Sequence, residues 1–143
     1  MIVANILMVK GADVVTAQPH RTVAETLRVL ADKGIGAIVV TGARQEVLGI
    51  ISERDIVRAF AKDGAAALEH PVSRYMTAKV VTTGESATVH EVMEAMTAGR
   101  FRHMPVVRDG ALTGIISIGD VVKNRLAEIE TEHQALRDYI ATA

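Results

Sequence analysis

The chain has 143 residues and a formal net charge of −1, and this near-neutral balance gives no electrostatic reason to expect binding to nucleic acid or to an anionic membrane. Hydrophobic residues make up 49% and charged residues 23% of the sequence, as is ordinary for a soluble globular domain, whereas aromatic residues make up only 3%, too few for the stacking platforms of single-strand-binding proteins. The absence of cysteine excludes disulfides, thiolate metal sites and a cysteine nucleophile, and it agrees with a reducing compartment.

The first residues, M-I-V-A-N-I-L-M-V-K, predict a short helix at residues 2–8. They have no basic segment at the start, and Lys10 and Asp13 end the apolar run before it is long enough for a signal peptide or a membrane span. We therefore expect a cytoplasmic protein without a membrane partner.

The next part of the chain predicts a strand, a helix, two more strands and a second helix. Thr22 is followed three residues later by Glu25, a capping box that begins a helix with apolar residues at steps of three or four. Ser52 has Asp55 at the same spacing and begins the second helix. The expected strands are the apolar, β-branched runs at residues 14–16, 37–40 and 47–52.

The same order of patterns then recurs. Residues 49–55 read G-I-I-S-E-R-D and residues 114–120 read G-I-I-S-I-G-D, while V-V-T returns at residues 80–82 and T-V-x-E at residues 88–91, before a strand at residues 104–107. A long unit present only twice predicts a pseudo-symmetric pair around a shared core, because a solenoid needs more copies. A cleft between the halves is the natural place for a ligand.

A connector around Pro71, with a short helical turn ending near Met76, joins the two copies. Beyond Asp120 the sequence has no Pro or Gly and predicts one long helix with an apolar stripe: Val122, Leu126, Ile129, His133, Leu136 and Ile140. The stripe overhangs a small domain and indicates a partner helix, most simply from a second subunit, although a helix folded back on its own domain would also cover it. We place the repeats at residues 5–65 and 71–126, and a helical extension at residues 127–143.

The two Ser-x-x-Asp elements, Ser52 with Asp55 and Ser117 with Asp120, each lie at a helix start after a Gly-led strand. Unpaired N–H groups and the positive end of the helix dipole favour an anion there, such as a phosphate. An aspartate one turn into the helix can accept two hydrogen bonds from a vicinal diol such as ribose. The alternative is that each pair is only a capping box.

The ordered set of V-V-T, T-V-x-E, a β-branched run and G-I-I-S-x-x-D, found twice, resembles a tandem pair of CBS domains, or Bateman module, over about residues 5–123. The resemblance implies an α/β (α+β) fold of two β-α-β-β-α repeats with pseudo-two-fold symmetry and a long C-terminal helix. It also implies two clefts for adenosine ligands, namely AMP, ADP, ATP, NAD(H) or S-adenosylmethionine, in a regulatory module without a catalytic domain that acts on an unknown protein partner.

Carried over from the family, the first cleft is expected to use Val15, Thr16, Gly36, Ala37, Ile38, Ser52, Arg54 and Asp55. The second is expected to use Val81, Thr82, His103, Met104, Pro105, Ser117 and Asp120. Because Gly119 stands where the first copy has Arg54, the phosphate charge in the second cleft must come from another residue. Arg100 and Arg102 are the candidates, unless they are only solvated loop charges. We expect the clefts to differ in affinity and the second to take the more extended ligand, such as ADP or NAD(H).

The remaining polar residues give no sign of a metal or catalytic site. No two histidines have ligand spacing, and neither H-E-x-x-H, a P-loop nor a dinucleotide-fold glycine pattern occurs. The leading hypothesis is a non-enzymatic nucleotide sensor that works as a homodimer. A homodimeric interaction module with vestigial clefts is the second. A small nucleotide hydrolase using Asp120 with His103 is disfavoured, because no nucleophile, base and orienting group can be assembled.

Overall fold

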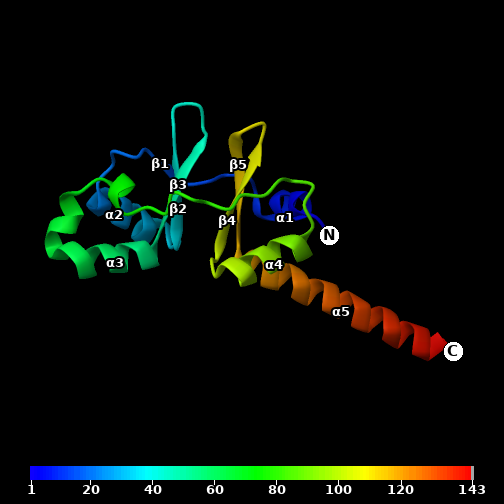
Figure 1. The fold of residues 1–143 in the computed structure, drawn as a ribbon. Coiled ribbons are helices and arrows are strands. Elements are labelled where there is room, and N and C mark those ends of the chain that lie inside the picture. Colours follow the sequence, from blue (N-terminus) through cyan, green and yellow to red (C-terminus); the bar gives the residue numbers. More distant parts are fainter. Residues whose placement is uncertain (143) are drawn as a thin grey trace.

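The computed structural model describes residues 1–142 and consists of two α/β units side by side, with a long helix projecting from the second (Figure 1). The first unit contains β1 (Thr16–Ala17), α2 (Val23–Lys33), β2 (Ala37–Thr41), β3 (Val47–Ser52) and α3 (Glu53–Asp63). The second contains α4 (Val89–Gly99), β4 (His103–Arg108), β5 (Ala111–Ser117) and α5 (Ile118–Thr142). Before the first unit lies α1 (Val3–Lys10), and the connector forms the 3₁₀ helices η1 (Gly64–Glu69) and η2 (Val72–Arg74). The expected pair of repeats with a long last helix is confirmed.

The four helix starts are those that the sequence predicts. Thr22 and Thr88 each accept a hydrogen bond from the N–H three residues later, at 3.2 and 3.0 Å, which satisfies one free donor of the first turn. The expected return bond from the Thr22 N–H to the Glu25 carboxylate is absent from the described residues, because that carboxylate accepts from Arg21 instead (3.4 Å). Of these four helix starts, the two that begin at the serines described below form the full reciprocal capping box.

The first unit has a three-stranded sheet in the order β1-β2-β3, with β1 parallel and β3 antiparallel to β2. In the second unit β4 and β5 pair antiparallel, but the strand predicted at residues 80–82 is reduced to a single parallel bridge between Thr83 and Val106. The reason is Pro105. Its counterpart Val39 donates its N–H to the carbonyl of Val15 at 3.4 Å, whereas a proline has no N–H to extend the ladder.

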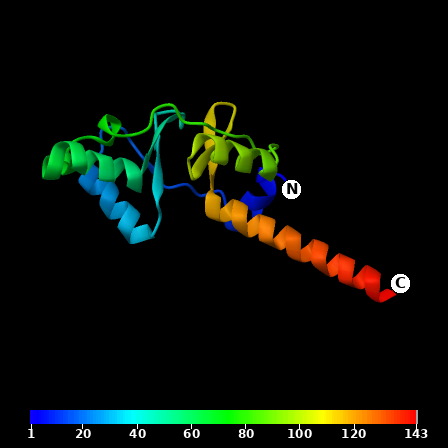
Figure 2. The ribbon, with the colours of Figure 1, turned by 60° about the horizontal axis from the view of Figure 1, so that its bottom comes forward.

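Each unit is completed by the segment that precedes the other one. Helix α1 buries Val3, Ile6 and Leu7 in the hydrophobic cluster of the second unit, and its start is fixed by the bond from Val3 N to the carbonyl of Ala87 (2.9 Å). Figures 1 and 2 both show α1 beside the second unit rather than the first. In the same way, Val72 of the connector is buried in the cluster of the first unit. The chain therefore crosses between the units twice, and neither core is complete alone.

Helix α5 runs past the domain and points away from it (Figures 1 and 2). The alternative that this helix folds back on its own domain is therefore wrong for its distal half. Its apolar stripe stays open: Val122 is 50%, Leu126 56% and Ile140 65% exposed. Among residues 1–142, no helix is both long and apolar enough to cross a membrane.

Candidate functional site

The two Ser-x-x-Asp elements form matching helix starts. Ser52 donates to Asp55 Oδ2 from its N–H and its hydroxyl, both at 2.9 Å, and Ser117 does the same to Asp120 Oδ2 at 2.8 and 3.0 Å. The aspartate N–H groups return bonds to the serine oxygens at 3.4 and 3.2 Å. Both pairs are therefore true capping boxes, and capping engages only one carboxylate oxygen of each aspartate.

The second carboxylate oxygen distinguishes the two elements. In the first unit, Asp55 Oδ1 accepts a hydrogen bond from the hydroxyl of Thr77 at 3.2 Å, and Asp55 is only 8% exposed. In the second unit, none of residues 1–142 donates to Asp120 Oδ1, and the side chain is 20% exposed. Asp120 therefore keeps an acceptor for a ligand, whereas both oxygens of Asp55 are already bonded within the protein.

Asp120 also has a cationic partner that the sequence analysis did not identify. The ammonium of Lys10, the last residue of α1, donates to Asp120 Oδ2 at 2.7 Å and to the carbonyl of Ile115 at 3.0 Å. Burial alone would raise the pKa of Asp120, but the hydrogen bonds from Lys10 and Ser117 outweigh it and hold this pKa below its ordinary value. Asp120 is consequently a carboxylate at neutral pH, as a diol acceptor must be.

Lys10 and Thr77 hold equivalent places in the two units. Thr77 pairs with Ile50 through its backbone, at 2.9 and 3.0 Å, and reaches Asp55 with its side chain. Lys10 reaches both Ile115 and Asp120 with its ammonium alone. Because these contacts join residues far apart in the chain, no local spacing pattern could have revealed them.

His103, at the start of β4, lies where the two units meet. A methyl group on Gly36, an expected residue of the first cleft, would stand 3.6 Å from the Cε1 atom of His103 and 3.7 Å from Glu53 Oε1. Burial, followed by the nearby charge of Lys10, lowers the pKa of His103, while Asp120 and Glu53 oppose this effect. The ring of His103 is therefore half-buried and uncharged at neutral pH, and charged groups of both units influence its pKa.

Val15 and Gly36 are half-buried, and the other expected site residues fall into two groups. Ala37, Ile38, Met104 and Pro105 are buried strand residues, whereas Thr16, Arg54, Val81, Thr82, Arg100 and Arg102 are exposed. Val81, 49% exposed, is an apolar side chain free to cover a ligand. Of the two candidate arginines, Arg102 is close enough to influence His103, but Arg100 lies exposed at the left-handed C-cap of α4.

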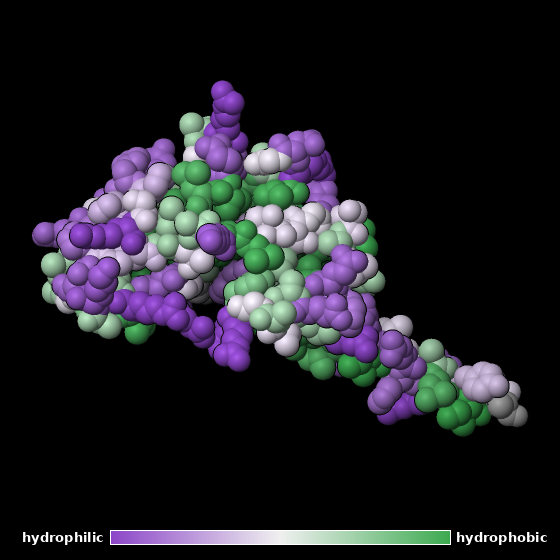
Figure 3. All heavy atoms as spheres, viewed as in Figure 1, coloured by the Kyte–Doolittle hydropathy of each residue, from purple (hydrophilic) through white to green (hydrophobic). Residues whose placement is uncertain are grey.

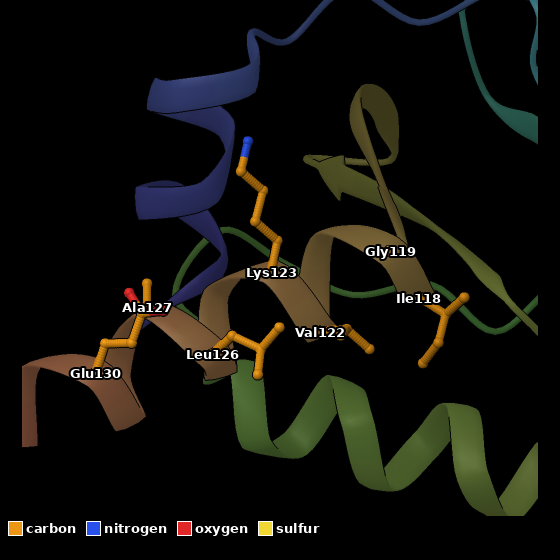
Figure 4. Close-up of a pocket in the computed structure, with 7 residues that line it drawn as sticks. All are labelled: Ile118, Gly119, Val122, Lys123, Leu126, Ala127 and Glu130. Atoms are coloured by element: carbon orange, nitrogen blue, oxygen red, sulfur yellow. The ribbon is translucent and has the colours of Figure 1, made fainter. Parts of the chain in front are cut away.

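Neither of the two most prominent surface pockets includes Ser52, Asp55, Ser117 or Asp120. A pocket of about 450 Å³ in the first unit contains Thr16 and Ile38 but is bounded by Arg21, just before α2, and by α2 residues such as Glu25. A groove of about 590 Å³ follows the first half of α5 beside α4; Figure 4 shows Ile118 and Leu126 directed toward α4 and Lys123 directed toward the opposite side. Within residues 1–142, no cluster of His, Asp and Glu could hold a metal ion.

The two α/β units, which share the order helix, strand, strand, helix and each have a Ser-x-x-Asp helix start, define the class of tandem-repeat α/β modules. The sequence matches the CBS domain model at residues 3–62 and again at residues 72–127. The chain belongs to the CBS domain family and carries a pair of these domains.

Solved structures agree with this assignment. A CBS-domain containing protein from Agrobacterium tumefaciens has 50% sequence identity and a TM-score of 0.84, over 87% of this chain and 99% of that one. A CBS domain protein from Pyrobaculum aerophilum, solved in complex with AMP, has 28% identity and a TM-score of 0.75, over 84% of this chain and 89% of that one.

Among curated relatives, a mitochondrial CBS domain-containing protein of Arabidopsis thaliana is 36% identical over 123 residues, which are 83% of this chain. The chain spans between 60% and 66% of the length of that protein and of two archaeal relatives.

Proposed function

We propose that the chain is a regulatory module that binds an adenosine nucleotide, with its main site in the second unit at Ser117 and Asp120 and AMP as the expected ligand. The observation that carries the proposal is the free acceptor of Asp120, a partly exposed carboxylate at the start of a helix. The AMP complex of the Pyrobaculum aerophilum relative supports the choice of ligand.

In the proposed pose, the ribose diol donates to Asp120, and the adenine packs against the exposed Val81, with its edge toward the backbone of residues 80–82. Met104, which was also expected in this cleft, is only 1% exposed and belongs to the hydrophobic core of the second unit. The phosphate lies at the first turn of α5. There the N–H of Ile118 is bonded to the carbonyl of Arg102 (2.8 Å) and that of Asp120 to Ser117, so the N–H of Gly119 is the donor left for an anion. Arg102 is the proposed arginine partner of this phosphate.

The first cleft is proposed to be the weaker one. Asp55 is buried and both of its oxygens are bonded by Ser52 and Thr77, so a ribose would have to displace Thr77 before it could bind. The exposed Arg54 still offers a charge for a phosphate. The occupied oxygens of Asp55 also favour the second candidate function, an interaction module in which a cleft is vestigial.

Titration calorimetry of the whole chain with AMP, ADP, ATP, NADH and adenosine tests the proposal. We expect one site of measurable affinity with AMP or another of these adenosine ligands. No binding by any of them below about 1 mM, which corresponds to only about −4 kcal/mol, would leave the interaction module as the better description. No catalytic step is part of the proposal, and turnover of bound nucleotide over hours would contradict it.

The module is further proposed to act as a homodimer through α5 in the cytoplasm. Figure 3 shows hydrophobic surface along the underside of α5 and again near its end. Val57 of α3, the counterpart of Val122 one repeat earlier, is also 67% exposed. A second copy offers a surface of the same chemistry, which an isologous contact requires. Nucleotide occupancy would then shift the units relative to each other, and a protein partner would read the change.

A further inference from the structure

We propose that Lys10 sets the charge preference of the second cleft, so that this cleft selects adenosine ligands with an anionic 5′ substituent over neutral or cationic ones. The inference rests on the proposed function and adds a specificity-determining residue to it. It assigns the role to a side chain from α1, which precedes the first unit in the sequence but is part of the core of the second.

The Lys10 ammonium lies beside the expected phosphate position. Lys10 Nζ and Ser117 Oγ contact the same carboxylate oxygen, Asp120 Oδ2, at 2.7 and 3.0 Å. The ammonium therefore lies at the α5 helix start, beside the expected phosphate position. Its side chain is 30% exposed, so a ligand can reach it.

Contacts of α1 with β5 hold Lys10 in place. Leu7, one turn before Lys10, is buried against Gly114, and the carbonyl of Ile115 holds the ammonium from the strand side at 3.0 Å. Because both ends of the Lys10 side chain are fixed, its methylene groups can adopt few rotamers. Lys10 is thus a preorganised cation rather than a mobile surface lysine.

Positive and negative side chains are balanced near the α5 helix start. Four charged groups, those of Lys10, Arg102, Asp120 and Glu53, lie close enough to influence His103, which pairs with Ser117 across the β4–β5 ladder beside the α5 helix start. Two are cationic and two anionic, so loss of Lys10 would leave the carboxylates in excess beside the phosphate. A phosphate would then be repelled, whereas a cationic substituent would be attracted.

The first unit has no lysine bonded to its capping aspartate, Asp55, among the described residues. The neutral hydroxyl of Thr77 takes the place of the ammonium on Asp55. The cation expected for the first cleft is Arg54, an exposed residue of α3 itself. The two units therefore obtain their positive charge from different parts of the chain, and Thr77 provides a matched control position.

The test compares the whole chain with the variants Lys10→Met, Lys10→Arg and Thr77→Val. Each is titrated with AMP, adenosine and S-adenosylmethionine, whose sulfonium and ammonium outweigh its carboxylate. For Lys10→Met we expect the preference for AMP over adenosine to fall roughly tenfold and the relative affinity for S-adenosylmethionine to rise. Lys10→Arg should keep the wild-type order, and Thr77→Val should keep it in the second cleft, because Thr77 contacts only the aspartate of the first unit.

Equal loss of affinity for all three ligands in Lys10→Met, or no change for any of them, would overturn the inference, because Lys10 would then be structural or remote from the ligand. If the variant does not fold, as judged by thermal denaturation, Lys10→Gln takes its place with the same expected ratios. A wild-type chain that binds none of the three ligands refutes the proposed function itself.

Discussion

Leu7 of α1 lies directly across Gly114 of β5, so that a methyl group on Gly114 would stand 2.9 Å from Cδ2 and 3.0 Å from Cδ1 of Leu7. In the other unit Met76 lies over Gly49 in the same way, with its sulfur 2.6 Å from such a methyl group. The glycine of each G-I-I-S motif thus marks the place where the segment preceding the opposite unit crosses a strand. It is required by close approach of chain segments and not by the ligand site.

The two glycines should differ in how well they tolerate a side chain. At Gly49 the added methyl group would also stand 2.9 Å from the carbonyl oxygen of Thr77, whose backbone is fixed by its bonds to Ile50. We expect Gly49→Ala to lower the free energy of unfolding by about 1–3 kcal/mol, and Gly114→Ala to cost less because only the side chain of Leu7 must move. Urea denaturation measures both, and an equal cost would contradict the argument.

Local patterns in the sequence were sufficient for most elements of the fold. The capping residues Thr22, Thr88, Ser52 and Ser117 located four helix starts, because capping depends on side chains only three residues apart. The prediction of a strand at residues 80–82 was wrong, because the residue that prevents its pairing, Pro105, lies on the partner strand.

The candidate site was less accessible to sequence reasoning. Asp120 was identified from its motif, but its partner Lys10 is 110 residues away, and Thr77 is 22 residues from Asp55. These contacts arise because α1 and the connector exchange sides, an arrangement that leaves no periodicity in the sequence. The sequence predicted a difference between the clefts from Arg54 and Gly119, and the structure adds a second difference, because Asp120 bonds to Lys10 where Asp55 bonds to Thr77.

Asp120→Asn should separate ligand binding from helix capping. The amide cannot serve as a charged acceptor for a diol, so we expect AMP affinity to fall roughly tenfold. Inorganic phosphate has no diol and should bind at least as well, because a negative charge has been removed. Calorimetry with both ligands is the measurement. Equal weakening of the two would show that Asp120 is only a cap.

Asp55→Asn is the matched control for that experiment. Since both oxygens of Asp55 already bond to Ser52 and Thr77, the substitution should lower the melting temperature while AMP affinity in the second unit stays unchanged. A loss of AMP affinity as large as that of Asp120→Asn would instead place the ligand in the first unit.

His103 should make stability depend on pH near neutrality. Its folded pKa lies below the value of about 6.5 for an unfolded histidine, so the unfolded chain binds more protons as the pH falls through this range. Stability should therefore decrease from about pH 7 downward until the folded pKa is passed. The lowered pKa of Asp120 acts in the same direction but only below about pH 4, so the two effects are separable.

Urea denaturation between pH 7.5 and 5 measures this dependence. We expect His103→Gln to have a flatter profile than the wild type over that interval, because glutamine does not titrate. His90→Gln is the control: His90 is exposed on α4 and pairs with Glu94, so its removal should leave the steep part of the profile in place. Identical slopes for His103→Gln and the wild type would show that the histidine is not buried as described.

The apolar stripe of α5 should be the dimer contact. Leu126 is 56% exposed in the groove that Figure 4 shows, and a carboxylate there would have to be desolvated when a second copy covers it. We expect Leu126→Glu to weaken dimerisation by at least about tenfold in sedimentation velocity measurements. Thr131→Glu introduces the same charge on the opposite side of the helix and should leave the dimer intact, whereas truncation after Lys123 should abolish it. A wild-type chain that sediments as a monomer at micromolar concentration, or equal effects of the two glutamate variants, would show that this stripe does not join two copies.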